Sequence, residues 1–221
     1  MEYKIIVAGI GPGNPDYMVP EARRVIESAR VLAGGRRALS QFAGENVQEQ
    51  CVIGADIPAV MAFIRKNLQH DDVVVMVSGD PGYYSLLDAL RREFPAESLR
   101  VIPGISAMQM AFARLALPWH EADLWSFHGR VPEDARLAYA PGRLAGMLTD
   151  GKYNSHTIPQ LLMEKGWPGE TGLAVCSRLS YEDETIIRTT LAEAGKHPVF
   201  SHCILVVTAL REMGRKYRTV A

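Results

Sequence analysis

The sequence predicts an α/β protein with a parallel sheet in its first half. Three short runs rich in β-branched residues, Ile5 to Ala8, Val73 to Ser78 and Leu99 to Ile102, lead into glycine or proline and are expected to be strands. Amphipathic segments separate or follow these runs, which is the order expected of a parallel sheet and its crossover helices. The helices are expected at residues 20–30, 58–69, 84–93 and 105–116.

The pattern changes after residues 117–119, where we place a domain boundary. Residues 1–117 are expected to form an amino-terminal α/β domain and residues 118–221 a carboxy-terminal α/β domain. The basic end of the chain, Arg211 to Ala221, is expected to be a solvated helix end. In the second domain we expect one helix at 157–165 and strands at 122–127, 144–149, 171–177, 184–189 and 203–209.

The charge balance and the apolar runs exclude some classes of function. The 221 residues carry 24 basic and 25 acidic side chains, so the formal net charge is only −1. This balance gives no overall field that would attract nucleic acid or an anionic membrane. The longest apolar runs, such as Val73 to Val77, are far shorter than the roughly 20 residues that cross a bilayer. The amino terminus has no secretory pattern, which favours a cytoplasmic protein.

Cys51, Cys176 and Cys203 are odd in number and far apart in the sequence. Their spacing suggests neither a disulfide framework nor a metal site. We therefore expect buried free thiols and no bound metal.

The first strand leads into a loop, Gly9-Ile10-Gly11-Pro12-Gly13-Asn14-Pro15-Asp16, in which glycines permit unusual backbone angles and prolines fix turns. Such a loop lets backbone amides come close to a ligand. A nicotinamide- or flavin-binding fold is one alternative, but Asn14 stands where the dinucleotide fingerprint has its third glycine. Pro12 also interrupts the turn into the helix, and no acidic residue ends a second strand near 31–33.

Two further loops follow the other predicted strands, Ser78-Gly79-Asp80-Pro81-Gly82-Tyr83-Tyr84-Ser85 and Pro103-Gly104-Ile105-Ser106-Ala107. Each loop taken alone is more often an ordinary structural turn than part of a ligand site. Because ligands bind at the carboxyl edge of open α/β sheets, three glycine-bearing loops there predict one shared site. We expect Gly104 to border the ligand directly, so that a bulky replacement would weaken binding.

The order and spacing of the three loops resemble the tetrapyrrole methylase family, and the resemblance extends over essentially the whole chain. It implies a parallel-sheet domain and a mixed-sheet domain, S-adenosylmethionine in the cleft between them with S-adenosylhomocysteine as product, and a homodimer. The family often continues its first loop to Leu-Thr, whereas this chain has Met18-Val19, which puts a threonine contact in doubt. The resemblance places the donor pocket at Pro12, Ser78, Gly79, Asp80, Tyr83, Ser106, Ala107 and Leu148, with Arg178 in a further contact region.

In the second half, Trp125-Ser126-Phe127-His128-Gly129-Arg130 resembles the His-Gly-Arg segment of the cobalt-precorrin carbon-5 methyltransferases within this family. The segments Ser177 to Glu184 and His202 to Val207 are similar to the same subgroup. The resemblance implies methylation of carbon 5 of a cobalt-precorrin in cobalamin synthesis. It also implies a separate partner that methylates carbon 15 and decarboxylates, since the chain stops near residue 221. His128 and Arg130 are the candidates for binding the carboxylates of the macrocycle; without the resemblance they would be a turn histidine and a solvated charge.

Two other functions stay open at this point. One is another activity of the family, on a different precorrin carbon or on ribosomal RNA ribose, although no basic stripe interleaved with aromatic residues stands out. The other is a binding or sensor protein that keeps the donor loops without turnover. No catalytic constellation is found and none is expected, because methyl transfer from a sulfonium depends mainly on positioning.

Overall fold

The computed structural model describes residues 3–209, which form two compact units that divide at Ala107/Met108. We call residues up to Ala107 unit 1 and residues from Met108 unit 2. The boundary expected at 117/118 falls after helix α5 (Ala107–Leu115), whereas the structure divides before most of this helix. The helix belongs to unit 2 because Met108 and Phe112 lie against Gly146 of that unit's sheet. The basic tail at 211–221 lies outside the described residues.

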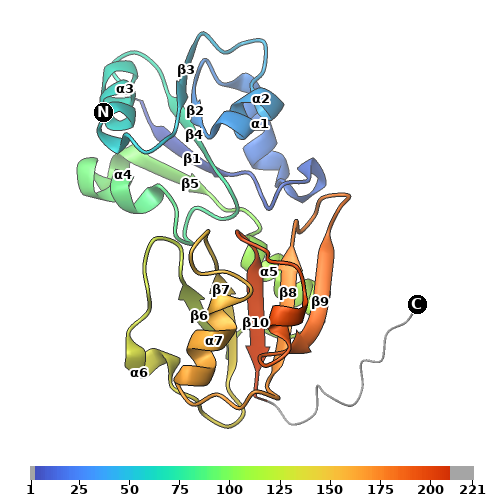
Figure 1. Cartoon of the computed structure of the whole chain (residues 1–221). Helices are drawn as coiled ribbons and strands as arrows, with labels where there is room; N and C mark the ends of the chain where they lie inside the picture. Colours follow the sequence, from blue (N-terminus) through green and yellow to red (C-terminus); the bar gives the residue numbers. More distant parts are fainter. Residues whose placement is uncertain (1–2, 210–221) are drawn as a thin grey trace. The chain divides into compact units, whose positions relative to one another are not determined.

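Unit 1 is a five-stranded parallel sheet with helices on its faces (Figure 1). The strand order is β3-β2-β4-β1-β5, so the first strand lies between the two other strands predicted from the sequence. The strands are β1 (Ile5–Gly9), β2 (Val31–Gly34), β3 (Glu49–Val52), β4 (Val73–Val77) and β5 (Leu99–Ile102). The helices are α1 (Pro20–Ser28), α2 (Arg36–Phe42), α3 (Ile57–Asn67) and α4 (Leu87–Glu93), with short 3₁₀ turns at Pro15–Tyr17 and Ala96–Ser98.

Both faces of this sheet are covered, which explains why the central strands read as unbroken apolar runs. Every residue of β1 and β4 is buried. Alternate residues of β1 serve opposite faces: Ile5 and Val7 pack with residues of α3 and α4, and Ile6 and Ala8 pack with residues of α1 and α2. The buried sheet is the rigid base from which the loops at its carboxyl edge extend.

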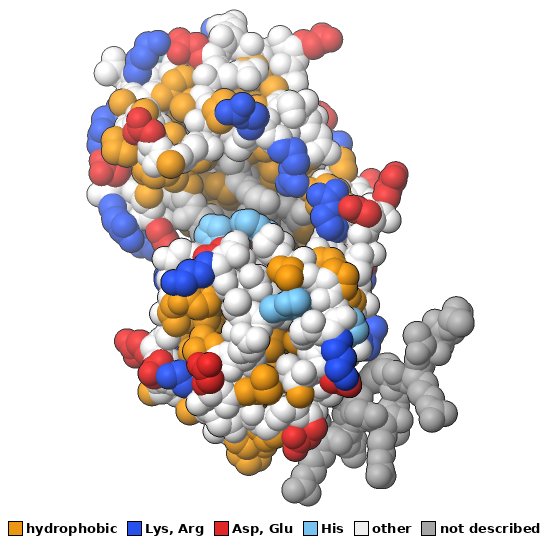
Figure 2. All heavy atoms as spheres, viewed as in Figure 1, with side chains coloured by type: hydrophobic (Ala, Val, Ile, Leu, Met, Phe, Trp, Pro, Cys, Tyr) orange, Lys and Arg blue, Asp and Glu red, His pale blue; other side chains and the backbone are white. Residues whose placement is uncertain are grey.

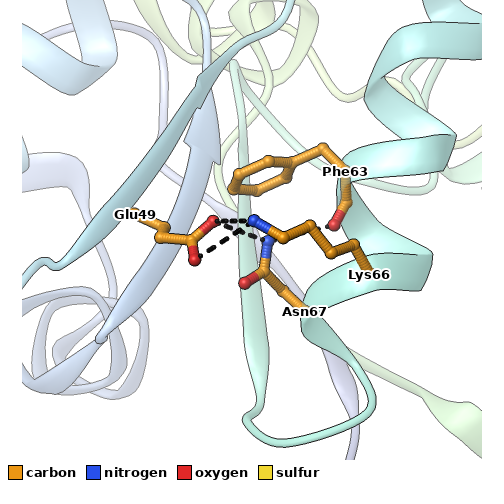
Figure 3. A network of polar contacts seen from close by, with 4 residues as sticks. All are labelled: Glu49, Phe63, Lys66 and Asn67. Carbon is orange, nitrogen blue, oxygen red and sulfur yellow. Dashed lines mark hydrogen bonds and ion pairs between the residues drawn. The ribbon is translucent and has the colours of Figure 1, made fainter.

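The edge strand β3 is joined to α3 by polar contacts (Figure 3). Glu49 accepts hydrogen bonds from Lys66 at 3.1 Å and from the side-chain amide of Asn67 at 3.3 Å. The hydrogen bond from Lys66 is the main cause that lowers the pKa of Glu49 below its usual range. Asn67 also donates to the carbonyl oxygen of Phe63, so one buried side chain ties the end of the helix to the edge of the sheet.

Unit 2 contains a five-stranded mixed sheet with the order β6-β7-β10-β8-β9, in which only β6 and β7 are parallel (Figure 1). The core on one side of the sheet includes Trp125, Phe127 and Trp167, with Leu162 of α7. All five strands and the long helix predicted for this half are confirmed. The elements are β6 (Asp123–Ser126), α6 (Asp134–Leu137), β7 (Leu144–Leu148), α7 (Thr157–Glu164), β8 (Gly172–Ser177), β9 (Thr185–Thr190), a 3₁₀ turn at Ala194–Lys196 and β10 (Ile204–Thr208).

The surface agrees with the balanced charge of the sequence. Basic and acidic side chains are interspersed on the face shown in Figure 2. Within residues 3–209 no helix is both long and apolar enough to cross a bilayer.

All three cysteines are free thiols; Cys176 and Cys203 are buried, and burial raises their pKa values to about 12 and about 11. Cys51, expected to be buried, is only half-buried because it lies on the edge strand.

Candidate functional site

The three glycine-bearing loops of unit 1 lie together at the carboxyl edge of the parallel sheet. They follow β1, β4 and β5, which are neighbours in the sheet. The first and second loops exchange two backbone hydrogen bonds: the Gly79 amide donates to the Gly11 carbonyl oxygen at 2.9 Å, and the Gly11 amide donates to the Gly79 carbonyl oxygen at 3.3 Å. Both glycines have positive φ angles, 76° and 72°, a backbone conformation that side chains strongly disfavour.

Asp80 joins the second loop to the third. One carboxylate oxygen accepts the Gly82 amide at 2.8 Å, and the other accepts the Gly104 amide at 3.0 Å. The side chain of Asp80 is therefore engaged within unit 1. What this segment can offer to a ligand is its backbone together with Ser78, which is exposed and has no hydrogen-bond partner among residues 3–209.

The glycines let the loops approach one another, and this corrects the role expected for Gly104. A Cβ atom on Gly104 would lie 2.3 Å from the carbonyl oxygen of Gly79 and 2.9 Å from the Cα atom of Gly9. A Cβ atom on Gly9 would in turn lie 2.7 Å from the Gly104 amide nitrogen. Gly104 thus faces the two other loops and was wrongly expected to face ligand space.

The remaining predicted residues of unit 1 surround these contacts. The Tyr83 hydroxyl is buried and has no hydrogen-bond partner within the described chain, and burial raises the pKa of this phenol well above its usual value. Tyr83 is therefore neutral and can donate a hydrogen bond to a ligand oxygen. Ser106 is buried, whereas Pro12 and Ala107 are half-buried.

The predicted residues of unit 2 gather at one edge of the mixed sheet. His128 and Arg130 follow β6, and Leu148 ends the parallel neighbour β7. Ile204, at the start of the antiparallel strand β10, pairs with Leu148 on one side and with Cys176 on the other. Arg178, which follows β8, therefore lies at the same edge. The predicted residues thus form two groups, one in each unit.

Arg178 already has partners in the turn between β8 and β9. Its guanidinium forms an ion pair with Asp183 at 2.9 Å and lies 4.4 Å from the ring centroid of Tyr181. Its φ angle is 54°, which is unusual for a residue with a side chain. These contacts give the residue a role in the turn, and a donor contact by Arg178 stays a prediction.

Thr149 and Asp150, which follow β7, hold the neighbouring segments in place. The Thr149 hydroxyl accepts the Cys203 amide and donates to the Cys203 carbonyl oxygen, both at 2.8 Å. Asp150 accepts the amides of Gly129 at 3.1 Å, Lys152 at 2.8 Å and Tyr153 at 2.7 Å. The bonds from Tyr153 and then Gly129 are the main causes that lower the pKa of Asp150 below its usual range.

His202 was not among the residues predicted for this site. Its ring lies edge-on to that of His128, with a centroid distance of 6.2 Å, and both side chains are exposed. His202 has a φ angle of 56°. Its position before a predicted strand was visible in the sequence, but only the antiparallel pairing of β7 and β10 brings it beside His128.

The protein is an α/β protein of two units. Unit 1 has glycine-bearing loops at the carboxyl edge of a parallel sheet, and unit 2 has a mixed sheet. The carboxyl edge of a parallel sheet is where α/β proteins bind ligands. Residues 4–195 match the family model described as Tetrapyrrole (Corrin/Porphyrin) Methylases, and the chain belongs to this family.

Individual relatives show which members of the family the chain is similar to. The chain is 34% identical over 182 residues to cobalt-precorrin-7 C(5)-methyltransferase of Salmonella typhimurium, covering 82% of this chain and 88% of that protein. It is 28% identical over 186 residues to precorrin-6Y C(5,15)-methyltransferase [decarboxylating] of a Sinorhizobium species, covering 82% of this chain and 44% of that protein. Uroporphyrin-III C-methyltransferase of Thermus thermophilus, complexed with S-adenyl homocysteine, shares the fold with a TM-score of 0.72, at 21% identity over 93% of this chain and 92% of that chain.

We expect Gly104→Ala to destabilise unit 1. The added Cβ atom would collide with backbone atoms of two loops, and overpacking of this kind costs about 1–3 kcal/mol of unfolding free energy. Urea unfolding followed by circular dichroism measures the effect. Gly54→Ala is the matched control, because a Cβ atom there would meet nothing within 4 Å. Equal stability of the two variants would show that the loops are not packed as described.

We expect Thr149→Val to destabilise unit 2 by about 1–3 kcal/mol. Valine has nearly the shape of threonine but leaves the buried amide of Cys203 without its acceptor. Thr149→Ser keeps the hydroxyl and should recover most of the loss in the same urea titration. If Ser and Val destabilise equally, the methyl packing of Thr149 and not its hydroxyl is what matters.

Proposed function

We propose that this chain is an S-adenosylmethionine-dependent methyltransferase that methylates carbon 5 of a cobalt-precorrin in cobalamin synthesis. The observation that carries the proposal is the joined set of three glycine-bearing loops in a member of the tetrapyrrole methylase family. The acceptor and the position of methylation rest on the 34% identity to a cobalt-precorrin-7 C(5)-methyltransferase over most of both chains.

The donor contacts are proposed for the loops of unit 1. Ser78 offers an unpartnered hydroxyl, and Tyr83 offers a buried hydroxyl that lacks an acceptor. A buried hydrogen-bond donor without an acceptor is costly, so a ligand oxygen at Tyr83 would be stabilising. The other residues proposed to line the donor site are Pro12, Gly79, Asp80, Ser106 and Ala107 in unit 1, and Leu148 and Arg178 in unit 2.

The task of the protein in this reaction is to position the reactants. S-adenosylmethionine supplies a methyl group on a sulfonium that is already activated for displacement. Correct alignment of reactants can supply roughly 7–11 kcal/mol of the barrier reduction. The three loops serve this purpose, because hydrogen bonds between their backbones and to the carboxylate of Asp80 fix their positions.

The acceptor contacts are proposed for His128 and Arg130. The macrocycle carries many carboxylates, and a chain with a net charge of −1 needs local cationic groups to bind them. Arg130 is exposed, and its planar guanidinium suits a carboxylate. The Sinorhizobium relative is named for carbons 5 and 15, and this chain aligns with 44% of it; we therefore infer that methylation of carbon 15 is a partner activity. We also infer a homodimer, which sedimentation velocity would test.

Calorimetry is expected to show that S-adenosylhomocysteine binds with one site per chain. The three loops form a single cluster, so a second site is not expected. Tyr83→Phe removes only the hydroxyl without an acceptor and should weaken binding about five- to tenfold, consistent with one neutral hydrogen bond. A folded protein that binds no S-adenosylhomocysteine would remove the basis of the proposal.

Arg130→Ala should lower kcat/KM for the cobalt-precorrin about ten- to 150-fold, because a charge-assisted hydrogen bond is worth about 1.5–3 kcal/mol. Arg130→Lys should restore only part of this, since it keeps the charge and loses the two-pronged geometry. Binding of S-adenosylhomocysteine should be unchanged in both variants. Loss of donor binding with an intact acceptor affinity would place Arg130 in the donor pocket instead, and no change at all would make it a solvated charge.

The same assay separates the proposed function from its alternatives. Radiolabelled donor is incubated with either a cobalt-precorrin or ribosomal subunits. Label in the ribosomal RNA would identify a ribose methyltransferase, and label in neither, despite binding of S-adenosylhomocysteine, would identify a binding or sensor protein.

A further inference from the structure

The edge of the mixed sheet presents two exposed imidazoles from segments far apart in the sequence. His128 follows β6 and His202 precedes β10, yet their ring centroids are only 6.2 Å apart. Figure 2 shows histidine side chains at the surface of the molecule. The acceptor contact proposed above involves His128 alone, and it does not explain why His202 lies beside it.

The segments that carry the two histidines are held by two adjacent residues, one for each segment. Asp150 accepts the amide of Gly129, the residue after His128, and Thr149 binds both backbone groups of Cys203, the residue after His202. The His128 amide also donates to the Ser126 hydroxyl at 3.3 Å. The two backbone segments are thereby fixed on either side of β7, so the proximity of the rings is built into the fold.

The backbone at His202 supports a specific role for this position. Its φ angle of 56° lies in the left-handed region, which costs free energy for a residue with a side chain. Strained backbone angles of this kind persist where the surroundings impose them, and they cluster at ligand sites. The hydrogen bonds between Thr149 and Cys203 hold the residue that follows His202, and the imidazole of His202 is left exposed.

We propose that the His128–His202 pair supplies an axial nitrogen ligand to the cobalt of the acceptor. This inference rests on the proposed function, in which the acceptor is a cobalt-precorrin. Imidazole is a favoured ligand of first-row transition metals. Either ring could ligate the cobalt, and the other would then lie edge-on beside it and limit its orientation.

The step is a ligand exchange without electron transfer. A neutral imidazole nitrogen donates its lone pair to cobalt and displaces an axial water, which leaves to solvent. The bond would hold the macrocycle by its centre, whereas carboxylate contacts hold it by its rim. Thr149 and Asp150 act here as positioning residues, because they fix the two segments and are not proposed to touch the acceptor.

The test uses the whole chain and cob(II)yrinic acid, a cobalt corrin with free carboxylates and no nucleotide base. Electron paramagnetic resonance of the complex should show cobalt lines split by a single nitrogen. In His128→Asn/His202→Asn this splitting should be lost, and the dissociation constant should rise about tenfold or more. Asparagine is chosen because it tolerates the left-handed backbone at position 202. The single variants then show which histidine ligates.

His120→Asn is the matched control. His120 is also an exposed histidine of unit 2, but it precedes β6 and so lies at the other end of that strand from His128. This variant should keep the nitrogen splitting. Absence of a nitrogen-ligated species in the wild type, whether or not the corrin binds, or its persistence in the double variant, would overturn the proposal.

Failure of this inference can be told apart from failure of the proposed function. Binding of S-adenosylhomocysteine and methylation of a metal-free precorrin require no cobalt ligand. If both occur while the nitrogen splitting is absent, the methyltransferase stands and the axial ligand falls. Loss of donor binding in the wild type would instead remove the proposed function itself.

Discussion

The close approach of three backbone loops is the constraint on which unit 1 depends. Cβ atoms on Gly9 and Gly104 would come within 2.7 Å and 2.3 Å of backbone atoms of a neighbouring loop, and Gly79 between them has a positive φ angle of 72°. Parallel strands β1, β4 and β5 bring the loops to one edge, but only the absence of side chains lets them touch. The glycines are therefore required by loop-to-loop packing before any ligand is considered.

Unit 2 reaches a comparable rigidity by a different route. Its sheet is mixed, so the segments that meet at one edge include some that follow a strand and some that precede one. Here side chains hold the segments together. Thr149 and Asp150, which follow β7, bind backbone groups on both neighbouring segments. The low pKa of Asp150 follows from this role, because three amides stabilise its ionised form.

How far the sequence predicts this structure depends on how deeply each element is buried. The central strands β1 and β4 were predicted because a doubly covered strand is apolar at every position. The edge strand β3 was missed, since Glu49-Gln50-Cys51-Val52 alternates between half-buried and exposed residues and carries few strand formers. Helix α2 was missed with it. The domain boundary was placed after the helix at 107–115, because sequence cannot show that Met108 and Phe112 pack on Gly146.

The same distinction holds for the site. The loops of unit 1 could be predicted because their geometry depends on local glycine and proline. Gly104 was expected to border the ligand, but its contacts are with loops about 25 and 95 residues away in the chain, which local sequence does not reveal. The roles of Thr149, Asp150 and His202 depend on antiparallel pairing between β7 and β10, which no local pattern encodes. Local sequence patterns therefore predict contacts that depend on glycine and proline. They do not predict contacts between side chains of segments that only the pairing of strands brings together.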